Sequence, residues 1–159
     1  MSVHSCLRFC TWMAAVALLV GCGRGPVSLD AVDLDPKGWS SADTARMTFI
    51  VENPDHRHDL QFGLRHDESY PYSNLYLFVR LLYPNGKTLT DTLECPLAAP
   101  DGQWYGDGGR WIDHRIGYKQ GVGFPLAGEY AVEVVHAMRQ DPLPGIAEVR
   151  FAMFDNTAP

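Results

Sequence analysis

Alternation between apolar and polar side chains is the dominant pattern along the chain, and it predicts β-strands. Residues 46–52 are rich in β-branched and aromatic side chains, and residues 59–65 alternate three large apolar side chains with Gln, Gly and Arg. Residues 74–83 are apolar at both odd and even positions. A strand that buries both faces is usually central, so we expect residues 74–83 in the middle of a sheet.

A hairpin turn follows this central strand. Pro84, Asn85 and Gly86 make a tight-turn sequence, in which Asn-Gly supplies the positive φ angles that the turn needs. Residues 87–94 then alternate three threonines with two leucines and an aspartate. These residues are therefore predicted to return as the second strand of a hairpin.

The second half of the chain also favours strands. Residues 84–128 contain nine Gly and four Pro among 45 residues, which excludes a long helix there. Residues 129–139 fit both helical and strand spacing, but three valines and the preceding Gly128 favour a strand. Residues 146–154 supply a last strand. Seven or eight short strands separated by turns predict an all-β fold, an antiparallel β-sandwich of the jelly-roll or immunoglobulin-like type.

The N-terminus has the features of a lipoprotein signal peptide. After Arg8, residues 9–20 carry no charge and only Thr11 is polar, and a run of twelve residues is too short to span a bilayer, which needs about 20. The segment ends in Leu-Val-Gly before Cys22, which resembles a bacterial lipobox. We therefore predict a signal peptide over residues 1–21 and lipid modification of Cys22, so that acyl chains anchor the protein in a membrane.

The remaining chain divides into two parts. Residues 22–36 have few large apolar side chains and no periodicity, which predicts a tether, and residues 37–159 form the predicted sandwich domain. Cleavage removes Cys6 and Cys10, and Cys22 carries lipid. Cys95 is then left without a partner, so we expect no disulfide within the exported chain.

Composition and motifs narrow the function further. The 159 residues carry 13 Lys and Arg against 19 Asp and Glu, a formal charge of −6, which disfavours nucleic acid as a partner. Cys95 precedes Pro96 without a Gly-rich turn or helix start to activate its thiol, so the prediction is that the protein is not an enzyme and needs no cofactor.

His56 and His58 are weak candidates for a metal site. A His-x-His pair on a strand places both imidazoles on one face, where they can ligate zinc. However, Arg57 lies between them and the stretch follows Asn53-Pro54. A solvated loop is the favoured interpretation, so no metal is predicted.

Aromatic side chains in the Gly-rich part form the main candidate binding patch. Its members are Trp104, Tyr105, Arg110, Trp111 and Tyr118. Three interpretations remain open. The aromatic rings pack over an open end of the sandwich, or the patch binds a protein, or Trp104 and Trp111 stack on a carbohydrate.

Several motifs in a fixed order resemble the gliding motility lipoprotein family GldH of Bacteroidetes, from about Tyr70 to Val149. They are residues 70–79 (YPYSNLYLFV), 84–86 (PNG), 91–94 (DTLE), 102–106 (GQWYG), 124–130 (FPLAGEY), 137–139 (AMR) and 143–146 (LPGI). Four residues depart from the family pattern, namely Gly117, His136, Glu148 and Arg150. These departures affect local contacts and leave the resemblance intact.

The resemblance implies a non-catalytic lipoprotein of the cell envelope, accessory to gliding motility and the type IX secretion machinery. Its partners are then a membrane, through the lipid anchor, and other envelope proteins of these systems, through protein–protein docking. No acidic or Lys-rich tract follows Cys22, so we expect the periplasmic side of the outer membrane. The alternative function is an envelope-tethered carbohydrate-binding module that uses Trp104 and Trp111.

Overall fold

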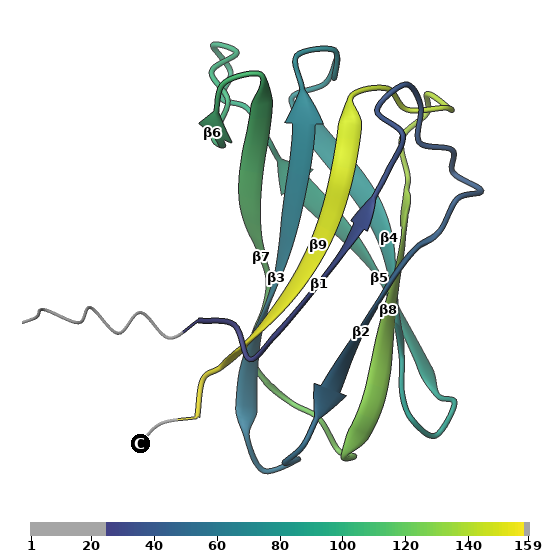
Figure 1. Ribbon diagram of the computed structural model, residues 1–159, viewed down its shortest axis with the longest axis vertical. Coiled ribbons are helices and arrows are strands. Elements are labelled where there is room, and N and C mark those ends of the chain that lie inside the picture. Colours follow the sequence, from purple (N-terminus) through teal and green to yellow (C-terminus); the bar gives the residue numbers. More distant parts are fainter. Residues whose placement is uncertain (1–24, 158–159) are drawn as a thin grey trace, which may run out of the picture.

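The computed structural model describes residues 25–157, and the predicted signal peptide and Cys22 lie outside this range. Two antiparallel sheets pack face to face (Figure 1). No helix that could span a membrane occurs within residues 25–157. The strands are β1 (Ser28–Asp33), β2 (Ala45–Val51), β3 (Arg57–Asp67), β4 (Asn74–Leu82), β5 (Thr88–Pro96), β6 (Asp107–Gly108), β7 (Trp111–Gly123), β8 (Gly128–His136) and β9 (Ile146–Asp155).

The strand order identifies the type of sandwich. The five-stranded sheet has the order β1-β9-β3-β7-β6, and the four-stranded sheet has the order β2-β8-β4-β5. With the two-residue β6 set aside, the first strand pairs with the last, the second with the last but one, and so on inward to β4 and β5. This nested antiparallel pairing is that of a jelly roll, so the all-β sandwich prediction is confirmed.

Each predicted strand overlaps an observed one. Residues 74–83 correspond to β4, which has β8 and β5 on its two sides as expected of a strand apolar on both faces. The ambiguous residues 129–139 are a strand as far as His136. The thirteen-residue β7 was not predicted, because glycines at three positions in its second half interrupt the apolar pattern.

The predicted tether is shorter than the sequence indicated. Residues 22–36 were assigned to it, yet β1 pairs with β9 along all six of its residues. Val32 and Leu34 pack against the core. The Asp30 carboxylate also accepts a hydrogen bond from the Thr48 N–H at 2.8 Å, which joins the edge strands of the two sheets. The sandwich therefore begins at β1 and not at residue 37.

Aromatic rings from both sheets fill the core. Phe49 on β2 stacks on Tyr130 at 5.3 Å between ring centroids and lies 5.2 Å from Phe151 on β9. Phe124 contacts the same ring at 5.3 Å. Each such aromatic pair contributes about 0.5–1.5 kcal/mol beyond its buried area. This cluster holds the two sheets together at the end where β2 finishes.

The lateral edge at β5 and β7 is closed by a second aspartate. The Tyr118 hydroxyl donates to Asp91 at 2.9 Å, and the Lys119 ammonium lies 2.5 Å from the same carboxylate. These contacts hold the pKa of Asp91 below its usual range. Each open side of the sandwich is thus bridged by one aspartate, Asp91 on this side and Asp30 on the other.

Candidate functional site

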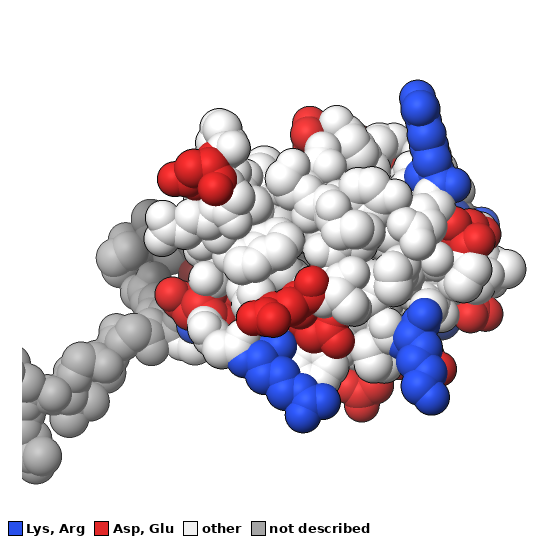
Figure 2. Space-filling view, turned by 90° about the horizontal axis from the view of Figure 1, so that it is seen from above, with Lys and Arg blue, Asp and Glu red and all other residues white. Residues whose placement is uncertain are grey.

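The predicted aromatic patch is divided by the fold. Trp104 is half-buried, with its ring edge-on to His66 at 4.4 Å between centroids, and Tyr105 beside it is 61% exposed. Both residues end a loop that is closed by the Tyr105 N–H donating to the Leu97 carbonyl at 2.8 Å. Figure 2 views the molecule from the end that carries this loop, and a broad uncharged area occupies much of the view.

Trp111 and Tyr118 lie elsewhere on β7. Trp111 pairs with Asp67 on the outer side of the five-stranded sheet, and the Arg110 guanidinium carbon is 5.8 Å from its ring. Tyr118 faces the interior, 5.3 Å from Phe62, because the hydroxyl reaches Asp91 on the opposite sheet. Tyr118 therefore does not belong to an exposed patch. Trp104 packs toward the core while Trp111 faces outward, so the two indoles do not share a face.

A pair of buried histidines lies beneath Trp104. His66 Nε2 and His114 Nε2 are 2.9 Å apart, and His66 Nδ1 donates to the Asp67 carbonyl at 2.8 Å. Because a carbonyl only accepts, His66 Nε2 is the acceptor and His114 Nε2 the donor in a neutral pair. Burial lowers the pKa of both rings, and with the neighbouring His66 it lowers that of His114 to about 4. The pair is a structural element of the core.

An exposed aromatic strip lies on the outer face of the four-stranded sheet. We define the strip as Tyr76, Phe78 and Val135, where Phe78 is 49% exposed, Tyr76 is 36% exposed and Val135 is half-buried. Phe78 pairs with Val135 on β8, and Tyr76 lies two residues earlier on β4, so the three side chains share one face. Contiguous exposed apolar patches often mark interaction sites, so this strip is a candidate surface.

One row of charges borders the strip. Glu133 on β8 forms ion pairs with Arg46 on β2 and Arg80 on β4. These arginines hold the pKa of Glu133 below its usual range, although its burial opposes the shift. With two guanidinium groups and one carboxylate, the row leaves one positive charge next to the strip.

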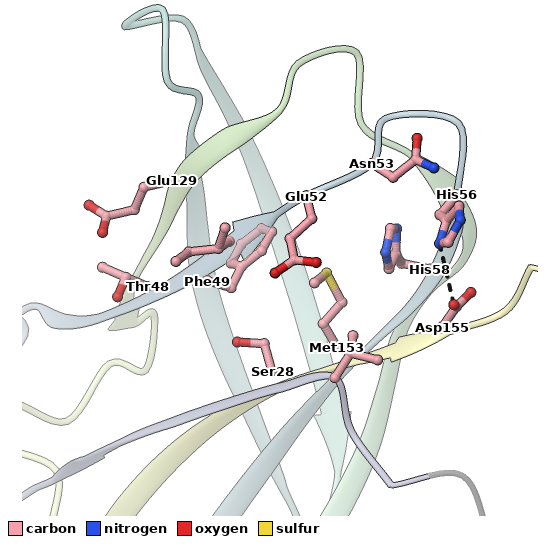
Figure 3. Close-up of a pocket in the computed structure, with 12 residues that line it drawn as sticks. Ser28, Thr48, Phe49, Glu52, Asn53, His56, His58, Glu129, Met153 and Asp155 are labelled. Atoms are coloured by element: carbon pink, nitrogen blue, oxygen red, sulfur yellow. Dashed lines mark ion pairs between the residues drawn. The ribbon is translucent and has the colours of Figure 1, made fainter.

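A pocket of about 540 Å³ opens between the edge strands of the two sheets. Figure 3 shows the labelled side chains that surround it, with His58 between Glu52 and His56. Its residues come from β1 and the residue before it, from β2, β3, β8 and β9, and from the β2–β3 loop. They are Val27, Ser28, Thr48, Phe49, Ile50, Glu52, Asn53, His56, His58, Glu129, Met153 and Asp155.

The two metal candidates meet at this pocket. His56 lies in the loop before β3, with Nδ1 3.4 Å from Asp155 Oδ2, and His58 is only 5% exposed, facing inward. Their ring centroids are 6.5 Å apart. Within residues 25–157, no group of three or more His, Cys, Asp or Glu side chains is arranged to hold a metal ion. The remaining candidate thiol, Cys95, is buried, and burial raises its pKa to about 12.

The geometry defines an all-β protein, a jelly roll whose candidate surfaces are an exposed strip, a pocket and a loop end. The family model described as "GldH lipoprotein" matches residues 28–152. The chain belongs to the GldH lipoprotein family, as the order of its motifs indicated.

Named relatives agree with this assignment. The "Gliding motility lipoprotein GldH" of Flavobacterium johnsoniae is 31% identical over 87% of this chain and 91% of its own length. The "Gliding motility lipoprotein GldH homolog" of Christiangramia forsetii is 35% identical over 66% of this chain and 71% of its own length. Among solved structures, PorU from Porphyromonas gingivalis aligns with 80% of this chain but 12% of its own, at 10% identity and a TM-score of 0.34, which is too low to relate the folds.

Proposed function

We propose that this protein is a lipid-anchored, non-catalytic envelope protein that assists gliding motility and type IX secretion by docking onto other envelope proteins. Family membership supports the motility role. Lipidation of Cys22 and attachment to the periplasmic face of the outer membrane are parts of this proposal, and they rest on the lipobox resemblance and on the residues that follow it.

The aromatic strip is the observation that carries the docking role. Tyr76 and Phe78 lie on the same face of β4, a strand paired on both sides, so their positions are held by a rigid sheet. Rigid aromatic side chains beside an arginine are the kind of surface that dominates binding energy in protein interfaces. Arg80 lies two residues from Phe78 on the same face, next to Glu133.

Replacement in cells tests this role. A deletion strain complemented with Phe78→Thr is expected to lose gliding, or secretion of type IX cargo in a host that does not glide, while the protein stays at its normal level. Tyr105→Ser in the exposed loop is the matched control, because it removes a comparable exposed ring from the other candidate surface. Normal gliding and secretion in the complete deletion would contradict the proposed role.

The arrangement of candidate nucleophiles also favours a non-catalytic protein. Cys95 has a raised pKa and lies inside the sandwich. In the part of the chain that the structure describes, the hydrogen-bond partners of the His66–His114 pair are the Asp67 carbonyl and the other ring, and no serine, cysteine or carboxylate is among them. A nucleophile activated by a neighbouring base is what acyl or phosphoryl transfer would need.

Carbohydrate binding through Trp104 and Trp111 is the weaker alternative. A sugar-stacking platform needs exposed rings on a common surface, whereas Trp104 packs on His66 and Trp111 faces the other side of β7. Glycan-array binding by the purified lipoprotein that disappears in Trp104→Ala and Trp111→Ala would restore this alternative.

A further inference from the structure

The pocket between β1 and β2 lies on an open strand edge. β1 pairs only with β9 and β2 only with β8, so the two strands share no ladder (Figure 1). Among the described residues, the hydrogen bond that joins them is the one that the Asp30 carboxylate accepts from the Thr48 N–H. Val27 donates its N–H to the Met153 carbonyl at 2.7 Å, so it continues along β9, and within residues 25–157 no second strand pairs with β2 at this edge.

The backbone of β2 offers hydrogen bonds at this edge. The Thr48 N–H points away from β8, because it is bonded to Asp30. In an antiparallel pair the direction of these groups alternates along the strand, so the N–H and C=O of Ile50 also point away from β8. Ile50 and Glu52 line the pocket. An extended peptide can therefore pair with β2 on the C-terminal side of Thr48, beyond the Asp30 hydrogen bond.

The pocket beside this edge is acidic. Glu52, Glu129 and Asp155 line it, and none of the twelve lining residues is Lys or Arg. Phe49 and Met153 provide an apolar floor. Lys and Arg side chains match this combination, because each has an apolar stem that can contact the floor and a charged end that can pair with the carboxylates.

His58 is the second feature that points to a ligand. It is 5% exposed, its Nδ1 atom has no hydrogen-bond partner among the described residues, and Figure 3 shows its ring within the group that lines the pocket. A buried polar atom without a partner is costly. Burial lowers the pKa of His58 against the opposing effect of Asp155, so the neutral form of this ring is favoured and does not offset the charge of the carboxylate.

We propose that this pocket binds an extended segment of a partner protein, which pairs with the edge of β2 and places a Lys or Arg side chain among Glu52, Glu129 and Asp155. This inference rests on the proposed docking function and adds a second surface with a defined partner chemistry. Backbone pairing provides affinity, and the acidic pocket selects a basic side chain.

Peptide binding to the full lipoprotein in detergent tests the proposal. The probes are fluorescent peptides of alternating Val and Lys, and of alternating Val and Glu, with binding measured by anisotropy. We expect the Lys peptide to bind and the Glu peptide to fail. Glu52→Gln combined with Glu129→Gln should weaken binding about tenfold, since two charge pairs are lost. Glu94→Gln on the distant edge strand β5 is the matched control and should bind normally.

A second variant tests the strand pairing. Ile50→Pro removes an N–H that β8 does not use, and it should abolish binding while the circular dichroism spectrum keeps its β signal. If this variant fails to fold, the Glu52→Gln and Glu129→Gln double variant still tests the proposal. Equal binding of the two peptides, or normal binding of the Lys peptide by the Glu52→Gln and Glu129→Gln double variant, would overturn the proposal. Displacement of the Lys peptide by phosphatidylethanolamine micelles would also overturn it, by assigning the pocket to a lipid headgroup.

The two proposals fail separately. Phe78→Thr leaves the pocket intact, so it should bind the Lys peptide as the unchanged protein does, whatever its effect on gliding. No binding of the Lys peptide together with lost gliding in Phe78→Thr would refute the pocket proposal alone. Peptide binding that persists while the complete deletion glides and secretes normally would refute the motility role and leave the pocket as a binding site.

Discussion

The outer faces of the two sheets differ, because one carries a network of paired charges and the other exposes aromatic side chains. On the five-stranded sheet, four charged side chains form ion pairs across three strands, namely Arg65 on β3, Asp113 on β7, and Glu148 and Arg150 on β9. On the four-stranded sheet, Tyr76 and Phe78 are exposed beside a single Arg–Glu–Arg row. Charges that are already paired within the chain gain little from a partner, whereas exposed aromatic surface gains from being covered.

A glycine makes the ion network possible. Gly63 on β3 pairs with Arg150 on β9, and a Cβ atom at residue 63 would lie 3.1 Å from Arg150 Cβ and 3.3 Å from its Nε. Without a side chain at this point, Arg150 reaches across β3 to Asp113 on β7. The departure of Arg150 from the family pattern therefore forms part of an internal network on the face that we do not propose for docking.

The inner faces of the sheets differ as well. Three buried histidines, His58, His66 and His114, lie on the five-stranded sheet, and His136 lies on the four-stranded sheet. A buried histidine with a lowered pKa stays neutral in the fold, whereas the same side chain in the unfolded chain takes up a proton at a higher pH. Acid therefore favours the unfolded chain. The five-stranded sheet should thus be the more sensitive of the two to acid.

Acidification should have the largest effect. The pKa of His114 is about 4 in the fold, against an ordinary value of about 6.5. Because the unfolded chain binds the proton first, stability falls as the pH drops from about 6.5 to about 4, by about 3 kcal/mol if this ring titrates alone. Urea unfolding at several pH values measures the loss. Hydrogen exchange should quicken in β3 and β7 before β4 and β8.

The control for this effect is His114→Gln. Its amide can still donate to His66 Nε2, but it does not titrate. The variant should lose less stability between pH 6.5 and 4.5 than the unchanged protein does. Carboxylates with lowered pKa values, such as Asp113 and Glu133, lose their contribution at lower pH, so they do not mimic this window. An unchanged pH slope in His114→Gln would mean that the pair does not cause the acid sensitivity.

Removing the central charge of the ion network should have the next largest effect. Asp113 accepts two hydrogen bonds from Arg65, each 3.0 Å long, and pairs with Arg150. Asp113→Asn leaves two neighbouring arginines with one fewer carboxylate. We expect the free energy of unfolding to fall by about 1–2 kcal/mol after allowing for solvent exposure. Urea unfolding should show the difference shrinking in high salt. A loss that salt does not reduce would point to packing instead of charge.

A smaller loss is expected for Gly63→Ala. The new methyl group would press on Arg150, whose side chain can shift by a few tenths of an ångström, so the cost should be about 1 kcal/mol. If the methyl group acts by moving Arg150 away from Asp113, its effect should be smaller in an Asp113→Asn background. Thermal unfolding of the two single variants and the double variant measures this coupling, and simple additivity would separate Gly63 from the network.

The sequence predicted one sheet much better than the other. All four strands of the four-stranded sheet fall largely within segments that were predicted as strands, whereas β1, β6 and β7 of the five-stranded sheet were missed. β1 interleaves aspartates with small and apolar residues, and its Asp30 bonds the opposite sheet. β7 contains glycines and uses Tyr118 to reach Asp91. Where polar contacts between sheets replace apolar burial, hydrophobic periodicity gives no signal.

The candidate site was predictable only in part. Composition located aromatic side chains in the Gly-rich part, but it could not assign a side to each one, and the strand β7 places Trp111 outside and Tyr118 inside. The apolar second face of residues 74–83 was visible in the sequence. That pattern indicated a central strand, and only the sandwich shows that this second face is left uncovered at Phe78.

The smallest effect on stability should accompany the largest effect on docking. Phe78 is 49% exposed, and Phe78→Thr introduces another residue that favours strands. The free energy of unfolding should therefore change by no more than about 0.5 kcal/mol. Partner capture by crosslinking in native membranes should nevertheless be lost, because the aromatic strip loses its most exposed ring. Asp113→Asn should show the reverse, with weaker folding and normal crosslinking. If Asp113→Asn and not Phe78→Thr abolished crosslinking at equal protein levels, the five-stranded face would be the docking face.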